Sequence, residues 1–382
     1  MTAAGFTGGE AEELRRAMGF KRSQQRMQAI ETKLRRGMSE RGITGTAQDD
    51  IVRGITSFAL YGFPESHAAS FALIAYASSY LKCHHPAAFL AGLLNAWPMG
   101  FYSPASLIKD AQRHGVDVRP IDIVKSKWLC DLEEEERGLA VRLGLRFVHG
   151  LRAESAQHIE AARSEKPFAH VADLGKRAAL SRAELLTLAE LGALASIDPD
   201  ASSRRAALWQ VAALERDPRS LFAGTSPPSA TSPLPEMSAL EETLADYRTS
   251  GISTGPHVMA HLRRRLAQRG VLSASELRDV PNGRWVRTAG HVIVRQRPGS
   301  ANGICFLTLE DETGTSNAVL TPQQFRRFRV PLHISPLVEI AGPLQNVDGV
   351  LHVRVKRLIA LGLTQADSQE PLTALPDSHD YH

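Results

Sequence analysis

Apolar residues recur three and four positions apart through roughly the first 200 residues, which is the spacing of an amphipathic helix. One clear run follows Pro64, where Phe71, Ile74 and Leu81 share one side of a helical projection. We therefore predict that this part of the chain is almost continuously helical. An acidic run at 131–136 interrupts the pattern and is predicted to be a solvated turn or a helix end.

The pattern changes to two-residue alternation after about residue 284. Glycine, proline and asparagine turns separate short strand-like segments there, at 285–294, 304–309, 317–320, 337–341 and 350–358. A helix-like insert at 322–328 lies between the third and the fourth segment. This order predicts an OB-type barrel. The fold class is therefore multidomain, with a mainly α N-terminal two-thirds and a C-terminal β OB-type barrel.

Composition limits the classes of protein that the sequence permits. Apolar residues make up 43% of the chain, enough for real cores, which excludes wholesale disorder. The three cysteines lie far apart, which excludes a disulfide framework and a CxxC metal site. No signal-peptide pattern is present, and the longest apolar run, 68–81, is too short to span a bilayer. We predict a cytoplasmic protein without a membrane partner.

The basic residues are mostly arginine, with 36 Arg against 9 Lys and a net charge of +4. Arginine makes planar, bidentate contacts with phosphate, but a GC-rich genome produces the same bias. The charge therefore permits a polyanionic partner without requiring one.

The last predicted strand has one apolar face and one basic face. The basic residues on it are His352, Arg354 and Lys356, and Arg295 and Arg297 close the first predicted strand. A basic strand face on an OB-type barrel fits a groove that follows a nucleic-acid backbone. An ordinary solvated face is the alternative. Trp285 and Phe306 are the candidates for base stacking, and either can instead belong to the core.

A second candidate site lies at 148–159, which resembles a helix-hairpin-helix motif. In that motif the backbone amides of a tight Gly-hydrophobic-Gly turn bind a DNA phosphate. Gly150 and Leu151 fit the pattern, but Arg152 stands where the second glycine belongs. The turn is therefore imperfect, although an arginine at this position can itself contact phosphate.

The sequence contains no catalytic motif of the hydrolase, P-loop or zinc-protease kind. Asp198 and Asp200 have the spacing of a metal-binding pair, but they lie in a Pro-rich segment. His257 and His261 are four residues apart on a predicted basic helix. Without a third ligand they are interpreted as surface histidines rather than a metal site.

Several longer segments resemble the fingers domain of bacterial C-family DNA polymerases, the alpha subunits of polymerase III. These segments are AGFTGGEA at 4–11, LRRAMGFK at 14–21, FALYGFPESH at 58–67, YLKCHHPAAF at 80–89 and LGA at 191–193. Two further segments resemble the error-prone subclass, NAWPMGFYSP at 95–104 and DAQRHG at 110–115. The resemblance covers essentially residues 3–360, and the order of fingers, helix-hairpin-helix and OB domain is also that of the family.

The resemblance implies a function for the N-terminal segments. Arg15 and Arg16 would bind the β- and γ-phosphates of the incoming dNTP, and Lys21, Ser66 and His67 match other nucleotide-binding positions of the fingers. The helix-hairpin-helix and OB regions would bind the DNA template-primer. The resemblance therefore implies an error-prone polymerase for damage-induced translesion synthesis.

The family's PHP domain and palm, with the Mg²⁺-binding aspartates, precede the fingers. This chain begins with a fingers-like segment, so we expect a C-terminal portion of such a polymerase: a fragment, a split gene product or an interrupted reading frame. Alone it is expected to be inactive for lack of the palm, because phosphoryl transfer needs metal ions held by ordered carboxylates.

The same interpretation of the sequence divides the chain into regions. We predict fingers at 1–140, a helix-hairpin-helix region at 141–198, a Pro/Ser-rich linker at 199–240, a helical connector at 241–283, an OB domain at 284–362 and a disordered tail at 363–382.

Two other functions stay open. One is a stand-alone single-stranded DNA-binding module, and the other is an interaction scaffold for the sliding clamp or for SOS mutasome proteins. PRSLF at 218–222 resembles the clamp-binding pentapeptide, but Pro218 replaces its anchoring glutamine. An upstream polymerase polypeptide is a further expected partner.

Overall fold

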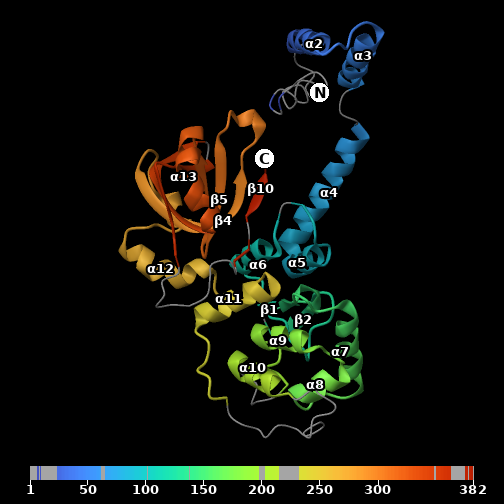
Figure 1. Cartoon of the computed structure of the whole chain (residues 1–382), viewed down its shortest axis with the longest axis vertical. Coiled ribbons are helices and arrows are strands. Elements are labelled where there is room, and N and C mark those ends of the chain that lie inside the picture. Colours follow the sequence, from blue (N-terminus) through green and yellow to red (C-terminus); the bar gives the residue numbers. More distant parts are fainter. Residues whose placement is uncertain are drawn as a thin grey trace.

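The computed structural model describes most of the chain. The described residues are 7, 9, 24–61, 65–100, 102–136, 138–197, 203–214, 232–347, 350–362, 375–376 and 378–381. Three parts follow one another along the chain: N-terminal helices, a mainly helical body and a C-terminal sheet (Figure 1).

The N-terminal part contains α2 (Gln24–Ser39), α3 (Thr46–Tyr61) and α4 (Glu65–His84). Leu34 and Met38 of α2 and Val52 of α3 are buried together, which joins these two helices. Helix α4 differs, because apolar side chains predicted to share a buried face are exposed, among them Phe71 at 58% and Ile74 at 57%. The helix was predicted correctly, but the described residues do not cover its apolar side.

The helical body surrounds one large core. Its helices are α5 (Pro86–Asn95), α6 (Pro104–Arg113), α7 (Ala153–Glu165), α8 (Val171–Arg177), α9 (Arg182–Leu191), α10 (Arg204–Ala213), α11 (Ala239–Ser250) and α12 (Val258–Gln268), with the 3₁₀ turn η2 (Leu145–Phe147) before α7. Helices α9 and α11 each begin with a capping box, formed by Ser181 with Glu184 and by Ser238 with Glu241.

Two predictions about this body are wrong. The acidic run is a strand, because β1 (Val118–Arg119), β2 (Asp131–Glu135) and β3 (Gly138–Arg142) form a sheet in the order β1-β3-β2. Arginines on the neighbouring strands neutralise its carboxylates, with Arg142 bound to Glu133 at 2.7 Å. The predicted linker also contains helix α10, which buries Ala207 and Val211 against the main core.

Strands of the C-terminal part pair in a closed ring. These strands are β4 (Trp285–Gln296), β5 (Cys305–Asp311), β6 (Gly314–Leu320), β7 (Leu337–Val347) and β8 (Val350–Arg354). The pairs run β4–β5, β5–β6, β6–β8, β8–β7 and β7–β4, and only β6–β8 is parallel. Leu307, Ile340 and Val353 are among the side chains buried within it.

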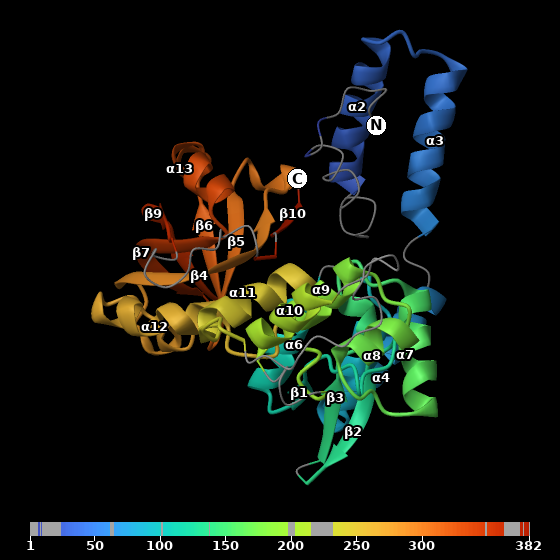
Figure 2. The same ribbon diagram turned by 60° about the horizontal axis from the view of Figure 1, so that its bottom comes forward.

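Helix α13 (Pro322–Ile334) connects β6 to β7, where the sequence predicts a helix. It lies at the side of the ring away from α12 (Figures 1 and 2). The remaining elements are the 3₁₀ turns η4 (Glu276–Asp279) and η5 (Gly299–Ala301) and the strands β9 (Arg357–Ala360) and β10 (His379–Tyr381).

The tail is partly ordered, which contradicts the predicted disorder at 363–382 for the residues described there. Leu375 is buried, and the carbonyl oxygen of Pro376 lies 2.9 Å from Nε2 of His291. Strand β10 pairs in parallel with the end of β4. A short polar segment thus gains order from the edge of a strand that is distant in sequence.

Among the described helices, none combines the length and the apolarity that a membrane-spanning segment requires.

A glycine is required where β7 crosses the end of β8. A Cβ atom built on Gly342 would lie 2.0 Å from the carbonyl oxygen of Arg354. We expect Gly342→Ala to lower the free energy of unfolding by about 1–3 kcal/mol or more, since backbone atoms must move. Urea denaturation followed by circular dichroism measures this. Gly362→Ala is the control, because its Cβ would meet nothing within 4 Å. Equal stability of the two variants would contradict the close crossing.

Candidate nucleic-acid interface

The outward side chains of β5, β6 and β8 form one surface, which we call the strand face. Phe306 pairs with Val319 and Val319 with Arg354, while Asn317 pairs with both Thr308 and His352. Phe306 is 39% exposed, and Asn317 and Arg354 are exposed as well. An aromatic ring, polar groups and a cation thus lie on adjacent strands, the combination that stacks bases and follows a phosphate backbone.

The alternation predicted for the last strand is confirmed. Val353 and Val355 are completely buried, whereas Arg354 and Lys356 are exposed. His352 is half-buried, and its Nε2 lies 2.9 Å from Oε1 of Gln345. Arg354 and Lys356 therefore present their charges to solvent. Both interpretations of this strand, a nucleic-acid interface and an ordinary solvated face, require this exposure.

Arg295 and Arg297 do not join the strand face. A bulge between Val292 and Val294 shifts the register of β4, so that Arg295 pairs with Leu307. Its Nη1 donates to the carbonyl oxygen of Leu332 in α13 at 3.0 Å. The guanidinium of Arg297 lies 5.0 Å from the ring centre of Phe325, also in α13. One extra residue in β4 thus directs both arginines toward α13, and their predicted role in DNA binding stays a prediction.

The two candidate aromatic residues are both exposed, Trp285 at 60% and Phe306 at 39%. Trp285 starts β4 opposite Pro343, so it lies at the opposite end of β4 from the segment that pairs with Phe306. Sequence reasoning missed Asn317, which alternation along β6 places outward beside His352.

A buried charge network attaches the ring to the helical body. Arg113 of α6 donates to Glu310 of β5 at 2.8 Å, and Glu310 is only 3% exposed. Arg263 of α12 binds Asp311 at 3.1 Å and also contacts Glu312. Since a buried ion pair is costly to break from one side, these contacts hold the ring in a defined orientation.

The same junction contains His257 and Lys109, both about 5% exposed. His257 is therefore not the surface histidine that the sequence suggests; its Nδ1 accepts the backbone N–H of Met259, and burial lowers its pKa well below the usual value. Lys109 donates to the carbonyl oxygen of Gly255, and burial lowers its pKa to about 8. Burial also raises the pKa of Glu310.

The hairpin candidate forms a turn directly before α7. Gly150 has φ +77° and is exposed, while Leu151 is buried. Arg152 is the N-cap of α7, and its Nε lies 3.2 Å from Oε1 of Glu184. The charge of this arginine is thus already balanced by a carboxylate from α9.

Glu184 holds the two ends of the hairpin region together. Its carboxylate also accepts the hydroxyl of Ser155 at 2.6 Å and the backbone N–H of Ser181 at 2.8 Å. Burial raises the pKa of this carboxyl, but hydrogen bonds from Ser155, Ser181 and Arg152 outweigh burial and bring the pKa to about 2.

The predicted nucleotide-binding residues are mostly outside the described part of the chain, namely Arg15, Arg16 and Lys21. Ser66 lies in the first turn of α4. His67 is exposed on α4, with its ring centre 4.4 Å from that of Phe71. The nucleotide-binding roles of these five residues therefore stay predictions.

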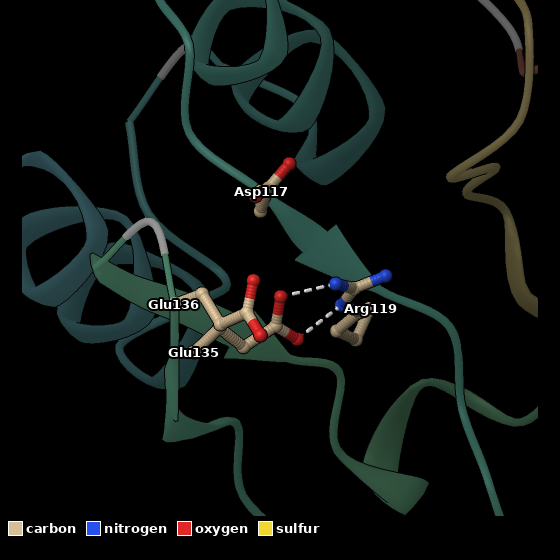
Figure 3. A pocket seen from close by; sticks show the side chains of 4 residues that line it. All are labelled: Asp117, Arg119, Glu135 and Glu136. Atoms are coloured by element: carbon tan, nitrogen blue, oxygen red, sulfur yellow. Dashed lines mark hydrogen bonds and ion pairs between the residues drawn. The ribbon is translucent and has the colours of Figure 1, made fainter.

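A pocket of about 480 Å³ lies on the small sheet of the helical body and is acidic. Figure 3 shows Asp117, Arg119, Glu135 and Glu136 around it, with Arg119 bound to both carboxylate oxygens of Glu135. The remaining carboxylates repel phosphate, so this pocket is not part of a nucleic-acid interface.

The other motifs of the sequence analysis give no site in the described residues. Asp198, Asp200 and the 218–222 pentapeptide lie outside them. Two adjacent carboxylates of α3, which the sequence analysis did not single out, are near arginines: Asp49 binds Arg35 at 2.6 Å, and Asp50 lies 3.5 Å from Arg53. Within the described residues, no group of three or more His, Cys, Asp or Glu side chains is arranged to hold a metal ion.

Comparison with known proteins gives one motif and many relatives. The helix-hairpin-helix motif family matches residues 115–207. The chain is 46% identical to the error-prone DNA polymerase of Anaeromyxobacter dehalogenans (strain 2CP-C), over 94% of this chain and 32% of that protein. It is 48% identical to that of Azoarcus sp. (strain BH72), over 94% of this chain and 34% of the relative. The chain thus spans about a third of the length of the curated relatives it matches.

Among solved structures, asparaginyl-tRNA synthetase from Pyrococcus horikoshii aligns with 27% of this chain and 27% of its own, at 21% identity and a TM-score of 0.21. A score this low supports no conclusion about the fold.

The low pKa of Glu184 gives a testable pH dependence. The usual value is 4.5 and the folded value about 2, so the ionised carboxylate stabilises the fold above pH 4.5. This contribution is lost as the pH falls from 4.5 toward 2. We expect Glu184→Gln to lower the free energy of unfolding by about 1.5–3 kcal/mol at pH 7 and by progressively less below pH 4.5.

Chemical denaturation of wild type and variant between pH 3 and pH 7 measures this difference. Glu154→Gln, which alters an exposed carboxylate on α7, is the control. A difference between wild type and Glu184→Gln that does not change with pH would show that the carboxylate is not held in its ionised form.

Proposed function

We infer that this chain holds DNA and the incoming nucleotide in an error-prone DNA polymerase. Nearly the whole chain is homologous to about one third of such an enzyme. The observation that carries this inference is the identity of 46–48% across 94% of the chain. The helix-hairpin-helix match supports DNA binding independently. The enzyme class is a DNA-directed DNA polymerase, and translesion synthesis is its proposed task.

The closed ring is proposed to be an OB-type barrel that binds single-stranded template. Its pairing order, with α13 between β6 and β7, supports this interpretation. Phe306 would stack on a base, while Arg354 and Lys356 would contact phosphates. His352, hydrogen-bonded to Gln345, would lie beside Arg354 on the same strand.

The hairpin is proposed to contact the backbone of the duplex. Gly150 is exposed in a left-handed conformation, which leaves space for a close approach of phosphate. Because Glu184 balances the charge of Arg152, the backbone of Gly150 and Leu151 would make the main contribution there.

Arg15 and Arg16 are proposed to bind the triphosphate of the dNTP, with Lys21, Ser66 and His67 nearby. Mg²⁺ is the expected metal of the intact polymerase. The described carboxylates Asp49, Asp311 and Glu312 do not form a Mg²⁺ site, because arginines already bind them. The metal ligands are therefore proposed to belong to a palm outside this sequence.

The exposed apolar surface of α4 supports a longer polypeptide. Three apolar side chains of this helix are exposed, Leu73 at 70%, Ile74 at 57% and Tyr76 at 73%. A partner that covered the helix would remove this apolar surface from water. An upstream polymerase polypeptide is the proposed cover. The sliding clamp and mutasome proteins remain proposed partners, and the cytoplasm remains the proposed location.

A second candidate function is a stand-alone single-stranded DNA-binding module. It is favoured by the strand face, whose aromatic and basic residues all lie within the C-terminal part. If the chain keeps all of its function after residues 1–100 are deleted, this candidate is supported over the polymerase.

Removing the cations of the strand face tests template binding. Each phosphate contact to a single strand contributes about 0.7 to the slope of log affinity against log salt, so Arg354→Ser with Lys356→Ser should lower the slope by one to two units. Fluorescence anisotropy of labelled oligo(dT) in a salt series measures it. Arg264→Ser with Arg278→Ser removes two other exposed arginines as a control. An unchanged slope would assign Arg354 and Lys356 to a solvated face.

The chain, purified alone, is expected to bind primer-template DNA without extending the primer. Positioning residues cannot replace the metal ions that activate the primer hydroxyl and neutralise the leaving group. A primer-extension assay with Mg²⁺ and all four nucleotides measures this, with a polymerase of known activity as the positive control. Extension that is abolished by Asp198→Ala and Asp200→Ala would overturn the proposal that the palm lies elsewhere.

A further inference from the structure

Helix α13 has a basic face that the interface described above does not use. Its sequence, PQQFRRFRVPLHI, contains three arginines and one histidine and no acidic residue. Arg326, Arg327 and Arg329 are all exposed. We call these three residues the α13 arginines.

The α13 arginines differ in their surroundings from the arginines at the junction with the helical body. Arg263, Arg269 and Arg287 bind carboxylates at the junction or on β7. None of the α13 arginines has a carboxylate partner within the described residues, where ion pairs otherwise involve many of the arginines. Their charges therefore face solvent uncompensated.

Aromatic rings hold two guanidinium groups at this end of the ring. The guanidinium of Arg327 lies 5.3 Å from the ring centre of Phe328, and that of Arg297 lies 5.0 Å from Phe325. A guanidinium over a ring keeps its N–H groups at the edge available for a bidentate contact. Such an arrangement lowers the entropy lost on binding phosphate.

The start of α13 also lies beside one end of the strand face. Helix α13 starts two residues after β6 ends, and Val319 of β6 pairs with Arg354. A Cβ atom on Gly303 would meet both Arg297 and Pro322, which places the end of β4 beside the start of α13. Figures 1 and 2 both show α13 on the side of the ring away from α12, so the helical body does not cover it.

The chemistry of this face favours phosphate over bases or a protein. Phe328 is buried and Phe325 half-buried, so neither ring offers a stacking surface for a base. The exposed aliphatic side chains Val330 and Ile334 lie toward the C-terminal end of the helix, beyond Arg326 and Arg327. An acidic protein surface is the competing partner and is one outcome of the test below.

We propose that the α13 arginines, with Arg297, bind backbone phosphates of a DNA strand that passes from the strand face over the start of α13. The contact is independent of base sequence. It extends the binding site beyond the length that the strand face alone covers. This inference rests on the proposed function, because it requires the strand face to bind single-stranded DNA.

The experiment compares short and long oligonucleotides on the full chain. The variant is Arg326→Ser, Arg327→Ser and Arg329→Ser combined. The control combines Arg182→Ser, Arg264→Ser and Arg278→Ser, three exposed arginines without a carboxylate partner in the described part of the chain. Both variants lose three positive charges, so any effect of net charge alone is the same. Circular dichroism checks that each is folded.

Anisotropy with labelled (dT)₆ and (dT)₂₄ in a salt series gives the affinities. For (dT)₂₄ the α13 variant should bind roughly tenfold more weakly than the control, with a salt slope smaller by about 2, because three phosphate contacts are lost. For (dT)₆ the two variants should bind alike, since an oligonucleotide of this length occupies little more than the strand face.

Equal binding of (dT)₂₄ by the α13 variant and the control would overturn the proposal and leave an acidic protein as the partner of α13. An equal loss for both oligonucleotides would also overturn it, because α13 would then belong to the strand face itself. Failure of the wild-type chain to bind either oligonucleotide would instead refute the proposed function on which the inference rests.

Discussion

The double pairing of β4 is the constraint on which the C-terminal part depends. The first half of β4 pairs with β7 and the second half with β5, so this one strand closes the ring. The bulge between Val292 and Val294 separates the two halves and turns Arg295 toward α13. Closure fixes the outward surface that contains Phe306, Asn317 and Arg354, so the strand face is a direct consequence of the pairing.

Closure also separates charge between the two ends of the ring. Glu310, Asp311 and Glu312 lie at the turn between β5 and β6 and meet Arg113 and Arg263 of the helical body. The opposite end carries the α13 arginines. Because its partners bury the acidic end, the basic end is the one left to solvent.

Under the proposed function, the hairpin and the ring would bind a polyanion differently. At the hairpin, Glu184 neutralises Arg152 and stabilises the turn, so the backbone near Gly150 would make the contact. At the ring, exposed arginines would contribute charge directly. We expect the two regions to differ in salt dependence accordingly, since only net cation–phosphate contacts release counterions.

The sequence by itself determined the elements whose signals are local. The positions of the ring strands and of α13 follow from alternation and turn residues, and the two faces of β8 follow from the two-residue period. Gly150 and its turn also follow from a local motif, which the helix-hairpin-helix match supports. The predicted boundaries of the regions and the roles of Arg15 and Arg16 stay predictions.

Only the tertiary structure decided the features that depend on residues far apart in sequence. The acidic run became β2 because Arg119 and Arg142 neutralise it, and His257 became buried because Glu310 and α6 pack around it. A bulge that no residue type announces removed Arg295 from the strand face. The uncompensated charges of the α13 arginines have the same origin: whether a charge is compensated depends on which partners the fold brings to it, and the sequence pattern does not contain that information.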